Sequence, residues 1–193
     1  FSDGGSANGA NVTHTFSAPV PEMTAAYGAP NACTTCHDNR TPEWAATVMD
    51  GWYGDVARRR AVLSIADAMY AAGSGDAGAI PRLASIATDK RAGPVLRASA
   101  AQFIARLAAR HGVQGEGLSG ILTNLGKAST DSEPMVRATT AEALGALADR
   151  RAVPMLVARL SDKARVVRGN AVAALLQLDV ASLDGPAGRV LSK

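Results

Sequence analysis

Apolar residues recur every three or four positions through residues 76–178, the pattern of helices that each bury one face. Three segments share a register in which an arginine precedes small and apolar residues at helical spacing; they start at Arg97, Arg137 and Arg168. A weaker copy starts at Arg58, so successive copies are 39, 40 and 31 residues apart. A shorter apolar segment precedes each of the last three copies, at residues 80–87, 118–125 and 153–160. The pattern predicts an all-α chain built from a repeated helix pair.

A single helix pair of this kind cannot bury its apolar face alone, whereas stacked pairs share one continuous core. We therefore predict an α-solenoid over residues 54–193. Residues 135–137 (Met-Val-Arg) and 166–168 (Val-Val-Arg) each follow a turn that contains aspartate. With the apolar spacing behind them, these segments resemble HEAT repeats over about residues 76–178. The resemblance implies stacked, HEAT-like helix pairs.

The recurring arginines have two interpretations. They can line a groove for an anionic ligand, or they can occupy one structural position in every repeat. We expect the second, with each guanidinium paired to a turn aspartate or to backbone carbonyls.

The first 40 residues are rich in glycine, proline, asparagine, serine and threonine, and show no sustained helical or strand period. We expect an ordered loop segment that wraps something large and apolar. The first helix should begin at Thr41-Pro42, with Thr41 as N-cap, and end at Gly51. Asp55 is expected to cap the next helix, which should run to about Ala72.

Residues 33–37 read Cys-Thr-Thr-Cys-His, a C-x-x-C-H motif. Its spacing suits covalent attachment of haem c, because Cys33 and Cys36 can add to the two vinyl groups while His37 ligates the iron. A redox dithiol would call for a βαβ context, which the pattern lacks. A zinc site would need four ligands, here Cys33, Cys36, His37 and His14, with two of them adjacent. A disulfide is the remaining alternative. We predict one covalently bound haem c.

The wider segment resembles multihaem c-type cytochromes of the cytochrome c554-like kind, in which a haem-binding part is often followed by helical repeats. The resemblance covers residues 14 to about 52 and rests on these elements: His14-x-Phe16, Pro19, Pro21, Gly28-x-Pro30-Asn31-Ala32 before the motif, and Trp44-Ala45 after it. This chain has a single C-x-x-C-H, whereas relatives usually carry several. Enzymatic activity of multihaem relatives is therefore not carried over.

The second axial ligand of the iron is expected to be His14, which lies 23 residues before His37. The resemblance also implies that this histidine is a distal ligand, of its own haem or of one on a neighbouring chain. Met23 and Met49 are alternatives, as is an open position. His111 is expected at a helix end, where a cation is favourable.

Composition limits the remaining classes. The formal net charge is only +3, with both signs interspersed, which does not favour nucleic acid. No segment has the roughly 20 consecutive apolar residues of a membrane-spanning helix. Because c-type haem is attached outside the cytoplasm, we expect a periplasmic or extracellular protein whose signal peptide was removed.

The predicted organisation is a loop-rich haem-binding segment at residues 1–53, followed by the solenoid. The expected function is electron transfer to a redox partner protein or to other copies of the chain, including a homo-oligomer or filament, and not enzymatic catalysis. Two alternatives stay open: an assembly subunit with a structural or sensory haem, and catalysis at an open iron.

Overall fold

The computed structural model describes residues 20–54 and 57–180, and within these ranges the chain is helical without strands. The predicted all-α fold is confirmed. The chain divides into two compact units, Phe1–Leu63 and Ser64–Lys193. This division lies ten residues after the domain limit expected between residues 53 and 54.

In the first unit, α1 spans Glu22–Tyr27, α2 spans Ala32–Cys36 and α3 spans Pro42–Tyr53, while α4, Ala57–Gly73, runs across the division. The second unit continues with η1 (Ala77–Ala79), α5 (Ile80–Thr88), α6 (Pro94–Arg110), α7 (Gly115–Ala128), α8 (Pro134–Ala146), η2 (Arg150–Ala152), α9 (Val153–Arg159) and α10 (Arg165–Gln177).

The expected loop before residue 41 is wrong where the structure describes it, because α1 and α2 lie there. With six and five residues, these helices are shorter than two turns, so no apolar period can show in the sequence. Each has a local terminator or cap: Gly28 adopts φ 67° after α1, and the Asn31 side chain accepts the Cys33 N–H at the start of α2.

Helix α3 begins as predicted, since Thr41 Oγ1 accepts the Trp44 N–H at 3.2 Å and Pro42 takes the first helical position. The predicted end at Gly51 is wrong. The helix continues to Tyr53 and ends at Gly54, which has φ 64° and donates its N–H to the Asp50 carbonyl at 2.8 Å. A glycine inside a helix costs only about 1 kcal/mol, so Gly51 does not terminate it. The predicted cap Asp55 lies outside the described residues.

Arg59 ties the first unit together. Its guanidinium forms ion pairs with Glu22 of α1 and, at 2.6 Å, with Asp50 of α3. Only 10% of the Arg59 side chain is exposed. The first unit is therefore held by charge pairing from α4 as well as by the contacts of α3 with α1 and α2.

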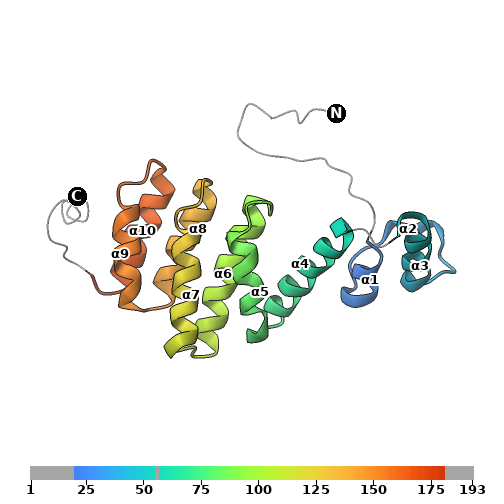
Figure 1. Ribbon diagram of the computed structural model, residues 1–193, viewed down its shortest axis with the longest axis horizontal. Coiled ribbons are helices and arrows are strands. Elements are labelled where there is room, and N and C mark those ends of the chain that lie inside the picture. The colour runs from blue at the N-terminus through green and yellow to red at the C-terminus, as the bar shows by residue number, and fades with distance from the viewer. Residues whose placement is uncertain (1–19, 55–56, 181–193) are drawn as a thin grey trace. The chain divides into compact units, whose positions relative to one another are not determined.

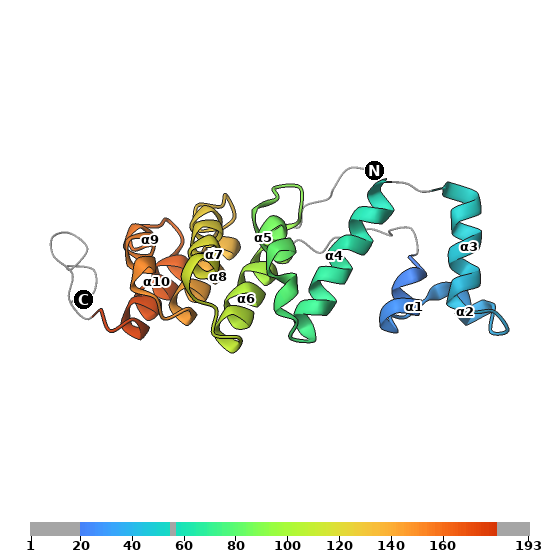
Figure 2. The same ribbon diagram turned by 60° about the horizontal axis from the view of Figure 1, so that its bottom comes forward.

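The second unit is a row of helix pairs, α5/α6, α7/α8 and α9/α10, which Figures 1 and 2 show following one another from green to red. The second helices of the pairs pack on one another in the order α6, α8, α10. One core cluster of leucine, isoleucine and many alanines runs through them. The predicted α-solenoid of repeated pairs is confirmed, and the predicted short apolar helices correspond to α5, α7 and α9.

Each second helix ends in the same way. The residues Gly75, Gly112, Ala148 and Asp179 follow α4, α6, α8 and α10 with φ of 89°, 60°, 52° and 55°. After three of them the next N–H bonds five residues back, from Asp76 to Ala71, from Val113 to Ala108 and from Val180 to Leu175. This is the Schellman pattern, which satisfies carbonyls that the helix end leaves free.

The recurring arginines link successive repeats. Arg97 on α6 donates from Nε and Nη2 to the Asp131 carboxylate in the next turn, both at 3.0 Å. Arg137 on α8 repeats this on Asp162, at 2.7 and 2.8 Å. The Nη1 atoms donate to turn carbonyls, from Arg97 to Ala92 and from Arg137 to Asp131 and Ser132. The expected pairing with turn aspartates and carbonyls is confirmed for Arg97 and Arg137, and we call these interactions the arginine ladder. The side chain of Arg58 lies outside the described residues.

Both ladder carboxylates are acidified. Burial raises the pKa of Asp131, but hydrogen bonds from Arg97, Lys90 and the Glu133 N–H outweigh it, so that the pKa falls to about 2. The Arg137 guanidinium lowers the pKa of Asp162 to about 2 against a smaller effect of burial. Both groups are therefore ionised at neutral pH.

Candidate functional site

The C-x-x-C-H motif forms one helical turn and its exit. The Asn31 side chain accepts the Cys33 N–H at 2.8 Å, which caps α2, and the His37 N–H donates to the Cys33 carbonyl at 3.0 Å, which closes it. Cys33 is half-buried and Cys36 is exposed, and both are free thiols. The turn therefore holds two free thiols and an imidazole within five consecutive residues.

These three side chains share one hollow with the apolar face of α3. The hollow has a volume of about 190 Å³, and its lining residues are Ala32, Cys33, Cys36, His37, Trp44, Ala45, Val48, Met49 and Trp52. The rings of His37 and Trp44 lie 5.0 Å apart and are tilted by 58°. The Arg40 guanidinium lies over the Trp44 ring, 5.5 Å from the ring centre. The motif therefore faces an aromatic and aliphatic wall.

The residues present fit a covalently bound haem. The thiols are unpaired, the imidazole borders the same hollow, and the facing wall is apolar, as a porphyrin requires. The hollow is smaller than the roughly 300–1,000 Å³ of pockets that enclose a ligand. It would therefore receive one side of the porphyrin. Trp52 lines it but is 72% exposed, which provides further apolar surface beside the opening.

The described residues give less support to zinc binding or a disulfide than to haem attachment. Within residues 20–54 and 57–180, no three His, Cys, Asp or Glu side chains converge as they would to hold a metal ion. Zinc needs such convergence. Haem attachment does not, because the two sulfurs bond to carbon atoms of the porphyrin and only the histidine bonds to iron. Cys33 and Cys36 also do not form a disulfide.

The predicted second axial ligand, His14, lies outside the described residues. Of the alternatives, Met49 lines the hollow and is 6% exposed, whereas Met23 lies on α1 and does not line it. His111 belongs to the second unit, where it follows the last residue of α6 and its Nε2 lies 2.8 Å from the Gly75 carbonyl. Its expected place at a helix end is confirmed.

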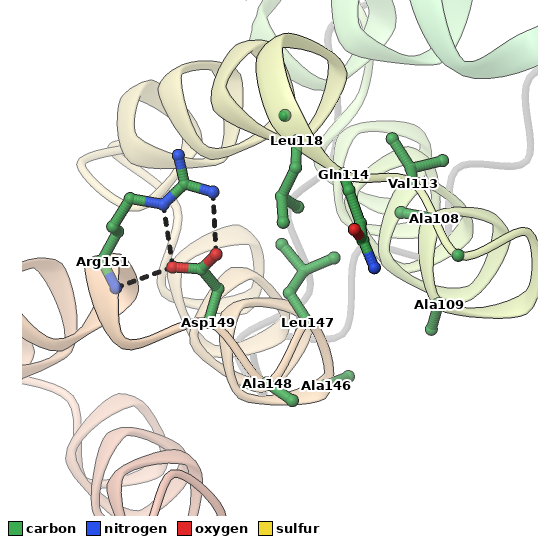
Figure 3. A pocket seen from close by; sticks show the side chains of 12 residues that line it. Ala108, Ala109, Val113, Gln114, Leu118, Ala146, Leu147, Ala148, Asp149 and Arg151 are labelled. Atoms are coloured by element: carbon green, nitrogen blue, oxygen red, sulfur yellow. Dashed lines mark hydrogen bonds and ion pairs between the residues drawn. The ribbon is translucent and has the colours of Figure 1, made fainter.

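A hollow in the solenoid lies between the ends of α6 and α8 and has a volume of about 570 Å³. Figure 3 shows Leu118 and Leu147 pointing toward each other across it. Its charged side chains, Asp149 and Arg151, bond to each other at 2.8–2.9 Å (Figure 3). Alanine and glycine make up most of the remaining lining, and the two charged side chains neutralise each other.

Comparison with known proteins supports the solenoid. A family model described as HEAT repeats matches residues 118–184, which include most of α7 and all of α8, α9 and α10. No curated protein matches the chain. Among the described helices, none is long and apolar enough to cross a membrane. The HEAT repeats form a helical scaffold, and repeats of this type often mediate contacts between proteins.

Proposed function

We propose that the protein is an electron-transfer cytochrome that carries one haem c on a HEAT-repeat scaffold. The observation that carries this proposal is the shared hollow of Cys33, Cys36 and His37 against the apolar face of α3. When bound, the haem would supply a one-electron couple at its iron.

Different residues of the chain would hold the haem in different ways. Cys33 and Cys36 anchor it through thioether bonds, and His37 supplies the imidazole to the iron. Trp44, Val48 and Met49 exclude water from the covered side. The exposed Trp52 and Tyr53 extend an apolar surface next to the site, on which a redox partner can dock. The proposal includes electron transfer without substrate chemistry, and a periplasmic or extracellular location.

The first experiment tests attachment. The chain is produced in a host that matures c-type cytochromes, and haem is detected after denaturing electrophoresis and by the absorption of its pyridine complex. We expect one haem per chain that survives denaturation, and none in a Cys33→Ala/Cys36→Ala variant. His111→Ala is the matched control and should keep full attachment. A mature wild-type chain with no covalent haem, or with stoichiometric zinc, would refute the proposal.

The second experiment tests the other axial position. With His14 as ligand, the ferric protein should be low-spin, and His14→Ala should convert it to a high-spin form that binds cyanide rapidly. A spectrum unchanged by His14→Ala would remove His14 from this role. Mixing His14→Ala with His37→Ala chains then distinguishes the source, because low-spin haem recovers only if His14 comes from a neighbouring chain.

An assembly role is the second candidate, and one regular surface favours it. Val95, Met135 and Val166 occupy the same position two residues before the ladder arginines, and are 61%, 52% and 55% exposed. Each repeat thus presents one apolar side chain to solvent at the start of its second helix. A haem that exchanges no electrons with any partner, in a chain that still assembles through this row, would favour a structural or sensory haem.

A further inference from the structure

The imidazole of His37 is held by packing on an aromatic ring. Its ring centre lies 5.0 Å from that of Trp44, with the two planes tilted by 58°, as is typical of aromatic pairs. Within residues 20–54 and 57–180, no side chain or carbonyl hydrogen-bonds to the nitrogens of this ring. A histidine that ligates a metal usually donates its second N–H to a carboxylate or a carbonyl, which fixes the plane of its ring. At His37, the contact with Trp44 takes that place.

The local sequence fixes where Trp44 lies. Its N–H donates to Thr41 Oγ1 at 3.2 Å, which places it in the capped first turn of α3. The Arg40 N–H donates to the His37 carbonyl at 3.0 Å and closes the connection between α2 and α3 into a tight turn. The two rings therefore meet across one short, hydrogen-bonded connection, and their contact depends on no distant part of the chain.

Arg40 also contacts the indole through its side chain. The guanidinium lies 5.5 Å from the centre of the Trp44 ring, within the range of a favourable cation–π interaction. Trp44 thus has a cation as one neighbour and the imidazole of His37 as another. Because both contacts restrict the indole, loss of the cation should loosen the imidazole less than loss of the indole itself.

The second tryptophan of α3 provides a contrast. Trp52 lines the same hollow as Trp44, but its side chain is 72% exposed. Its ring contacts that of Tyr53, with the centres 6.4 Å apart and the planes at 84°. Both tryptophans therefore border the haem site proposed above, whereas the imidazole contact belongs to Trp44.

We propose that Trp44 is the positioning residue of His37, which sets the plane of the imidazole at the iron, and that Arg40 restricts the indole in this role. The inference rests on the proposed haem c. It concerns only the side of the porphyrin that His37 occupies, so it holds whichever group binds the opposite side. The orientation of an axial imidazole influences the g values of ferric haem, which gives the role a spectroscopic signature distinct from folding.

The test is electron paramagnetic resonance of the ferric, haem-loaded chain. The wild type should give one narrow set of g values, and Trp44→Leu should broaden its low-field feature about twofold, because the imidazole can then adopt several planes. Trp44→Phe keeps a ring against His37 and should restore most of the wild-type width. Trp52→Leu, the same substitution on the same helix, is the matched control and should leave the spectrum unchanged.

Arg40 is tested in the same way. Arg40→Leu should broaden the low-field feature less than Trp44→Leu does, and Arg40→Lys, which keeps the cation, should restore the wild-type width. Haem attachment is measured for every variant after denaturing electrophoresis. It should be complete in all of them, because Cys33 and Cys36 are unchanged.

A second measurement uses the diamagnetic ferrous form of the wild type. Nuclear Overhauser contacts should join the protons of the Trp44 indole to those of the His37 side chain, and they decide the matter if Trp44→Leu does not mature. Attached haem without these contacts, or with a spectrum that Trp44→Leu leaves unchanged, would overturn this inference alone. A wild-type chain without covalent haem would overturn the proposed function together with it.

Discussion

The Arg97 guanidinium and the Asp131 carboxylate, which lie 34 residues apart in the chain, form two parallel hydrogen bonds of 3.0 Å with side chains that are only 5% and 1% exposed. A charge pair so far from water is costly to break on one side, because the remaining charge is left without its partner. The pair therefore fixes the stacking of α6 against the following turn.

Arg97→Met should lower the free energy of unfolding by about 3 kcal/mol, since it removes two hydrogen bonds from the buried Asp131 carboxylate and leaves the contact with the largely exposed Lys90. Arg97→Met combined with Asp131→Asn should recover part of that loss. Urea denaturation measures both. Arg91→Met is the control: its side chain is 92% exposed, so loss of its pair with Asp89 should cost less than about 1 kcal/mol. Equal losses for Arg97 and Arg91 would contradict the assignment.

The ladder also predicts an acid dependence. The pKa values of Asp131 and Asp162 are lowered in the fold from 3.8 to about 2, so the unfolded chain binds more protons between these values. The stability that the pairs contribute is fully present above about pH 4 and is lost as the pH falls through about 2. The difference in unfolding free energy between the wild type and Asp162→Asn should be constant above about pH 5 and shrink below pH 4. A difference that grows on acidification would be inconsistent with these pKa values.

Ala148 ends α8 with φ 52°, a conformation that costs a residue with a Cβ about 1–2 kcal/mol. Ala148→Gly removes this strain but adds the backbone entropy of glycine, so we expect a net gain of about 0.5–1 kcal/mol in thermal or urea unfolding. Ala173→Gly, at an exposed position inside α10, should instead lose about 1 kcal/mol. A loss at both positions would argue against the left-handed turn.

Gly145 is required by the close approach of α8 and α10. A Cβ there would lie 2.7 Å from the Ala174 Cβ and 2.9 Å from its Cα. Gly145→Ala should therefore cost about 1–3 kcal/mol despite the better helix propensity of alanine. Gly120→Ala on α7, where a Cβ would meet nothing within 4 Å, should gain about 0.5–1 kcal/mol. Calorimetry should therefore show a lower unfolding temperature for Gly145→Ala and a higher one for Gly120→Ala.

The solenoid could be predicted because its signal is repeated. Arg97, Arg137 and Arg168 share one register, and a threefold pattern outweighs the weak preference of any single residue. The pairing of Arg97 and Arg137 with turn aspartates followed from the same argument. Positive φ at Ala148 and Asp179 could not be predicted, because neither residue favours that region strongly and the helix ends that impose it lie in the tertiary structure.

The structure of the first unit was harder to predict, because its sequence signals occur once and are not repeated. Helices α1 and α2 depend on single local residues, such as Asn31 at the start of α2. Gly51 predicted the end of α3, but this helix continues to Tyr53 and ends at Gly54. The motif Cys33–His37 is local, so the hypothesis of haem attachment could be formed from the sequence. The wall that faces it, Val48 and Met49, is defined only once α3 lies against α2.

The ladder has a consequence for how such a chain can vary in length. At both complete steps the donors are Nε and Nη2 of an arginine, and the acceptor is an aspartate that also accepts an N–H two residues ahead, from Glu133 or Ala164. The two interfaces therefore share the same polar contact, although Gly145 packs against Ala174 more closely than an alanine could. Excision of one whole helix pair would bring Arg97 opposite Asp162, with the same donor and acceptor atoms meeting as before. Loss or duplication of a whole pair therefore keeps the arginine–aspartate contact at the new junction, and the apolar packing around it is what has to adapt.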